Sequence, residues 1–122
     1  MVDTSQIDRG ILAHAKWKNR LFDAVNTGKS ESTVQDTRSD NQCEFGKWLA
    51  SLPPSEKSSE HFQKVTALHA EFHQAASEVL ELALSARKEE AEAAIAVGSR
   101  FPLISSNLTM AMSAWKAATR GN

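Results

Sequence analysis

Four side chains in this 122-residue sequence have the chemistry of metal ligands: His14, Cys43, His69 and His73. Imidazole nitrogen and thiolate sulfur are donors that zinc and other borderline-soft metals accept. His69 and His73 are four residues apart, and on a helix such residues lie one above the other, separated by about 6 Å along the axis. Two imidazoles in this arrangement can bind a single ion, although packing alone also produces the same spacing.

Glu71, between these two histidines, argues against a hydrolytic zinc site. In the helical zinc-protease pattern, the glutamate directly follows the first histidine and acts as the general base. Here it comes two residues after His69, which rotates it by about 200° around a helix. We therefore expect Glu71 to face away from any ion that the two histidines bind.

Cys43 is predicted to lie at the start of a short helix, where unpaired N–H groups stabilise a thiolate. Its alternative role is that of a small buried hydrophobic residue. His14 lies in the middle of an otherwise apolar helical face, where its alternative is a core histidine bonded to a backbone carbonyl. His61 precedes His69 by eight residues, about 12 Å of helix, so it cannot share one ion with both later histidines. We interpret His61 as a near-surface or capping residue.

The elements that must position these residues are helices, because apolar residues recur at helical spacing along most of the chain. The pattern predicts a polar loop over 28–40 and helices over four segments: 5–27, 41–52, 55–86 and 89–118. Three of these helices are long, and the short one carries Cys43. We therefore predict an all-α, antiparallel four-helix bundle that forms a single domain of residues 1–122.

Several helix ends are marked by residues that favour them. Ser39 followed by Gln42 fits a capping box for the short helix. Ser55 is the expected N-cap of the following long helix. Gly98 and Pro102 are expected to loosen or kink the last helix, since Pro102 cannot donate a backbone hydrogen bond.

Composition excludes several classes of function. Fourteen basic and fifteen acidic residues give a net charge of −1, so no basic surface for nucleic acid or anionic membrane is expected. The longest uncharged stretch, 101–115, is too short and too polar to span a bilayer. The single cysteine rules out an intramolecular disulfide, and no signal peptide is evident, so we expect a cytoplasmic protein.

Three segments together resemble a known family. They are His14-Ala15-Lys16-Trp17, Cys43-Glu44-Phe45-Gly46-Lys47-Trp48-Leu49 and His69-Ala70-Glu71-Phe72-His73, with 29 residues from the first histidine to the cysteine and 26 from there to the second histidine. The pattern is similar to that of the chemoreceptor zinc-binding domain of bacterial signalling proteins. The similarity covers roughly residues 7–80. One departure is that the bulky Trp17 follows the first histidine by three positions, where some members place it two on.

The resemblance implies a helical bundle that binds one zinc ion per chain through His14, Cys43, His69 and His73. It further implies a homodimer with a regulatory role and without catalytic residues. Members of the family are attached to soluble chemoreceptors or to enzymes that make cyclic di-GMP. In them, zinc or oxidation of the zinc-bound cysteine by hypochlorous acid changes the output.

The residues alone leave three alternatives open. A metalloenzyme would use His14, His69 and His73 as ligands and water as the fourth. A phosphotransfer bundle would use His14 as phospho-acceptor, but Trp17 would crowd its ring. The third alternative is a helical interaction module that binds no metal.

Overall fold

The computed structural model describes residues 3–30, 33–39 and 43–120, and within these ranges the regular structure is entirely α-helical. This confirms the predicted all-α class. The helices are α1 (Thr4–Thr27), α2 (Val34–Arg38), α3 (Glu44–Ser51), α4 (Pro54–Lys57), α5 (Glu60–Leu84), α6 (Lys88–Ala94) and α7 (Arg100–Arg120).

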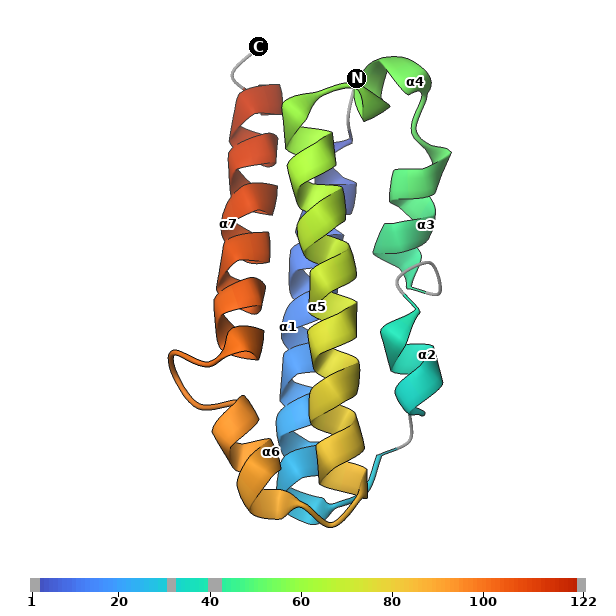
Figure 1. Cartoon of the computed structure of the whole chain (residues 1–122). Coiled ribbons are helices and arrows are strands. Elements are labelled where there is room, and N and C mark those ends of the chain that lie inside the picture. The colour runs from blue at the N-terminus through green and yellow to red at the C-terminus, as the bar shows by residue number, and fades with distance from the viewer. Residues whose placement is uncertain (1–2, 31–32, 40–42, 121–122) are drawn as a thin grey trace.

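The long helices α1, α5 and α7 lie side by side, and α2 and α3 follow one another along the side opposite α7 (Figure 1). The chain descends along α1, returns along α2 and α3, descends along α5 and returns along α7. Successive helical segments of the chain therefore run antiparallel to one another, as predicted. The returning segment, predicted as a loop over 28–40 and one short helix over 41–52, instead contains two short helices, α2 and α3.

The core is formed by the apolar faces of the long helices. The buried side chains of α1 include Ile7 and Val25, and those of α5 include Val65, Phe72 and Leu80. From α7, the buried side chains include Phe101, Leu108, Met112 and Trp115. Helix α3 adds Phe45 and Leu49 to this core. The helices are thus held by the periodic apolar positions that the sequence predicts.

The prediction of a loop throughout 28–40 was wrong, because Val34–Arg38 forms α2. The hydroxyl of Thr33 caps this helix by accepting a hydrogen bond from the Asp36 backbone N–H at 3.0 Å. Five residues are too few to show a helical apolar period, and α2 buries only Thr37. Tertiary packing against α5 supplies the stability that the sequence pattern did not indicate.

Two further boundaries differ from the prediction. Ser59, rather than Ser55, is the N-cap of α5, and its hydroxyl accepts from the Phe62 backbone N–H at 3.1 Å. The preceding residues Pro54–Lys57 form α4. The predicted capping box for the short helix involves Gln42, which lies outside the described residues, as does the predicted helix start at residue 41.

The last helix, predicted to be loosened or kinked, is instead divided into two separate helices. Helix α6 ends at Ala94 and α7 begins at Arg100. Gly98 between them has φ 92°, a left-handed conformation that glycine adopts without steric cost. Pro102 lies in the first turn of α7, where a missing N–H breaks no hydrogen bond.

In the described part of the chain, no helix is both long and apolar enough to cross a membrane.

Candidate metal centre

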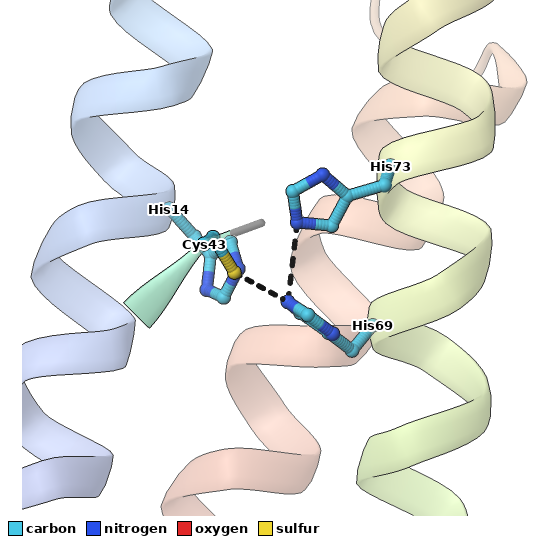
Figure 2. A group of neighbouring side chains, drawn as sticks. All are labelled: His14, Cys43, His69 and His73. Carbon is cyan, nitrogen blue, oxygen red and sulfur yellow. Dashed lines mark hydrogen bonds between the residues drawn. The ribbon is translucent and has the colours of Figure 1, made fainter. Parts of the chain in front are cut away.

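The four predicted ligands come from three helices that are distant in sequence and meet in the middle of the bundle. His14 is buried on α1, and His69 and His73 are buried on consecutive turns of α5. Cys43 is half-buried and is the N-cap of α3, as its predicted position at a helix start requires. In Figure 2 the three rings and the sulfur point toward a common centre between α1 and α5.

Distances show how closely the donor atoms approach one another. One ligand atom from each of the four residues lies within 4.8 Å of all the others. Cys43 Sγ is 3.2 Å from His69 Nε2, and His69 Nε2 is 3.1 Å from His73 Nε2 (Figure 2). The ring centroids of His14 and His69 are 5.0 Å apart. The structure thus brings together all four residues that the sequence analysis selected.

His14 provides the clearest test of whether these residues suit a metal. Its Nδ1 and Nε2 are both buried and have no hydrogen-bond partner among the described residues. An imidazole buried in this state costs on the order of 1–3 kcal/mol per unsatisfied group, unless a ligand accepts its lone pair. A cation bound at the centre would remove that cost. Three imidazoles and one thiolate are also a donor set that tetrahedral zinc accepts.

The protonation of the centre favours metal binding at neutral pH. Burial lowers the pKa of His69 to about 3, with further lowering by the nearby His14 and His73. Burial likewise lowers the pKa of His14 to about 4, helped by His73 and opposed by the backbone of Gly10. That backbone group makes no hydrogen bond of acceptable geometry to either ring nitrogen. Both imidazoles are therefore neutral at pH 7, the form that donates a lone pair to a metal.

Helix α2 orients one of the candidate ligands. His73 Nδ1 lies 2.9 Å from the backbone carbonyl oxygen of Thr37, a completely buried residue. A carbonyl only accepts, so Nδ1 carries the proton, and Nε2 of the neutral ring presents its lone pair to the centre. The sequence analysis missed this contact because it missed α2. The Thr33-x-x-Asp36 capping pattern was a signal that could have located this helix.

The thiol is oriented by its own helix. The Gly46 backbone N–H donates to Cys43 Sγ at 3.3 Å, which is the N-cap interaction of α3. Such N–H groups stabilise negative charge on sulfur. The side chain that fixes the start of α3 is therefore also the one that joins the histidine cluster.

Other candidate side chains stay outside the centre. Glu71 is exposed and His61 is exposed, as their positions on the helix predicted. Among the described residues, no carboxylate joins the group formed by the three histidines and the cysteine. The general base that a hydrolytic site on α5 would need is therefore not in the cluster.

Comparison with known proteins places this arrangement in a family. The chemoreceptor zinc-binding domain, a zinc-binding signalling domain, matches residues 14–80, which include all four residues of the cluster. No curated protein and no solved structure matches the chain. Since the match covers more than half of the chain, and since its histidines and cysteine converge as described, the chain belongs to the chemoreceptor zinc-binding domain family.

Proposed function

We propose that this chain binds one zinc ion through His14, Cys43, His69 and His73 and acts as a regulatory sensor domain in bacterial signal transduction. The observation that carries the proposal is the convergence of four donor atoms within 4.8 Å. Three nitrogens and one sulfur would complete a tetrahedral shell and leave no position for a substrate water. This favours regulation over metal catalysis.

Zinc, when bound, would supply a fixed link between three segments of the chain. The histidines already belong to long helices that pack through extensive apolar surfaces. Cys43 belongs to the eight-residue α3, which buries only Phe45, Gly46 and Leu49. We therefore expect α3 to respond most to the state of the centre. Zinc concentration would shift its position only to the extent that zinc binds the two positions with different affinity.

The same thiolate gives the domain a second input, oxidation. Attack of the Cys43 thiolate on the chlorine of hypochlorous acid forms an S–Cl bond and releases hydroxide. Water then displaces chloride and leaves a sulfenic acid, so that sulfur loses two electrons and chlorine gains them. A sulfenic acid is a weaker ligand than a thiolate. The chain has one cysteine, so a disulfide that resolves this product would need a second molecule.

The remaining features of the proposal come from the family. We propose a homodimer in the cytoplasm that controls a chemoreceptor or an enzyme that makes cyclic di-GMP. These assignments rest on the family membership that residues 14–80 establish.

Zinc content tests the proposal directly. Protein purified without an affinity tag should contain one zinc per chain, and a strong chelator should remove it. Cys43→Ser should bind zinc more weakly and lose its response to oxidant while its helix content is unchanged. His61→Ala is the matched control, because His61 is exposed and outside the cluster. The proposal fails if the parent protein binds no zinc, or if the Cys43 variant matches it in affinity and oxidant response.

A further inference from the structure

Two grooves flank the metal centre, and they expose different ligands. The larger one, about 480 Å³, is lined by Cys43 and His73 and by residues of α1, α2 and α3. The smaller one, about 240 Å³, lies between α3 and α5 and is lined by His69. Cys43 Sγ and His73 are therefore reached through the larger groove, and His69 through the smaller one. We call them the thiol groove and the His69 groove.

The thiol groove also has a distinctive charge. Among the described residues that line it, the two charged side chains are carboxylates, Asp36 of α2 and Glu44 of α3. Glu44 makes a long, exposed ion pair with Lys47 at 3.9 Å, which weakens its field. Among the lining residues that the structure describes, Asp36 is therefore the main source of negative charge. The charged side chain that lines the His69 groove is Lys57.

We propose that the thiol groove is the port through which reagents reach Cys43, and that Asp36 makes it favour neutral and cationic reagents over anions. This inference rests on the proposed function, for which it names the class of input. The zinc cation and neutral oxidants such as hypochlorous acid would enter, whereas an anion such as hypochlorite would be disfavoured.

The physical basis is the approach of the reagent to sulfur. A thiolate reacts only with a molecule that reaches it, and here the access is a concave surface with low-dielectric walls. Charges that line such a surface change the local concentration of charged reagents and their association rates. The effect acts within a Debye length, about 8 Å at physiological ionic strength, and so weakens with added salt. Neutral reagents do not feel it.

A pair of alanines allows the route to be tested by steric block. Ala13 lines the thiol groove, Ala50 lines the His69 groove, and both are exposed on helices. The reaction of Cys43 with iodoacetamide, which forms a thioether and releases iodide, is followed in chelator-treated protein. Ala13→Phe should slow it several-fold, and Ala50→Phe should leave it unchanged. Equal rates in the two variants, or slowing by Ala50→Phe alone, would overturn the assigned port.

Charge selectivity is tested with two alkylating reagents of similar size. The measured quantity is the ratio of the rates with anionic iodoacetate and neutral iodoacetamide. Asp36→Lys should raise this ratio about threefold at low salt, as expected for reversing one charge near a surface site. Asp23→Lys is the control, because it makes the same change of net charge at a distant position on α1. Asp23 is about 13 Å of helix beyond His14, so this variant should leave the ratio unchanged. An unchanged ratio in Asp36→Lys would overturn the selectivity.

Zinc affinity measured in the same variants separates the two proposals. Normal zinc binding together with unaltered alkylation would reject the port and leave the sensor function standing. Failure of the parent protein to bind zinc would reject the sensor function, while the alkylation rates would still decide whether the groove is the route to Cys43.

Discussion

The two sides of this bundle are attached to its centre by different kinds of interaction. Helix α7 has 21 residues and buries five large apolar side chains, Phe101, Ile104, Leu108, Met112 and Trp115. On the opposite side, α3 buries two large apolar side chains, Phe45 and Leu49, and α2 buries only Thr37. The second side depends in addition on polar contacts with the histidines of α5.

The packing of α7 is therefore independent of the state of the centre, whereas part of the attachment of α2 and α3 depends on it. Burying a large apolar side chain contributes roughly 1.5–3 kcal/mol regardless of metal or redox state. The contact between Cys43 and His69 and the one between Thr37 and His73 depend on the protonation, oxidation and metal occupancy of the groups involved. We therefore regard α7 as a fixed part of the scaffold and α2 and α3 as the responsive part.

Leu108→Ala should produce the largest loss of stability, because Leu108 is almost completely buried in α7. A cavity at such a site costs about 2–5 kcal/mol. Zinc affinity should change little, since no ligand comes from α7. Urea unfolding and a zinc competition assay measure the two effects. A large loss of zinc affinity in a variant that stays folded would show that α7 is not independent of the centre.

Acid should destabilise the zinc-free protein. The folded-state pKa values of His14 and His69, about 4 and about 3, lie below the unfolded value of 6.5. Between pH 4 and pH 6.5 the unfolded chain binds more protons than the folded chain. The contribution of these histidines to the free energy of unfolding is therefore fully present above pH 6.5 and falls as the pH decreases toward 4. The slope is about 1.4 kcal/mol per pH unit for each imidazole that stays neutral in the fold.

Urea midpoints of chelator-treated protein at pH 7.5, 6 and 5 measure this slope, with His61→Ala as a control outside the cluster. In the zinc-loaded protein, the same acid should also release the metal, because protonated imidazole and thiol are not ligands. A midpoint that does not move with pH would contradict the buried, neutral histidines.

Gly10→Ala should affect both sides of the bundle, with a smaller loss of stability. A Cβ at Gly10 would lie 2.5 Å from Phe45 Cδ1 and 2.8 Å from Met112 Cε, so the rigid Phe45 ring of α3 and the flexible end of Met112 of α7 would both have to move. Overpacking of this kind costs about 1–3 kcal/mol. Because Phe45 is in the helix that Cys43 caps, zinc affinity should fall as well.

Gly98→Ala is the matched control for this variant. Gly98 has φ 92°, which strains an alanine, but nothing lies within 4 Å of a Cβ there. We expect it to lose stability through backbone strain and to keep its zinc affinity. Loss of zinc affinity in Gly98→Ala, or its retention in Gly10→Ala, would contradict the coupling of Phe45 to the centre.

The parts of this molecule that the sequence predicted are those that depend on residue periodicity. His14, His69 and His73 lie on long helices whose apolar repeat fixes the faces they occupy, so their convergence followed from spacing and family resemblance. Cys43 was correctly placed at a helix N-terminus.

The parts that the sequence did not predict depend on tertiary contacts. Helix α2 is five residues long and carries no apolar period, so its packing against α5 could not be predicted from the sequence pattern. Its contribution to the centre is the backbone carbonyl of Thr37, a group that every residue type has. The choice of Ser59 over Ser55 as a cap was equally undetermined, because both serines precede helical residues.

X-ray absorption at the zinc edge of tag-free protein is the most direct test of the central claim, that four distant side chains bind one metal ion. The account predicts three nitrogen neighbours at about 2.0–2.1 Å and one sulfur neighbour at about 2.3 Å. In Cys43→Ser the sulfur shell should disappear. A parent spectrum without sulfur, or with a water oxygen in its place, would contradict the account.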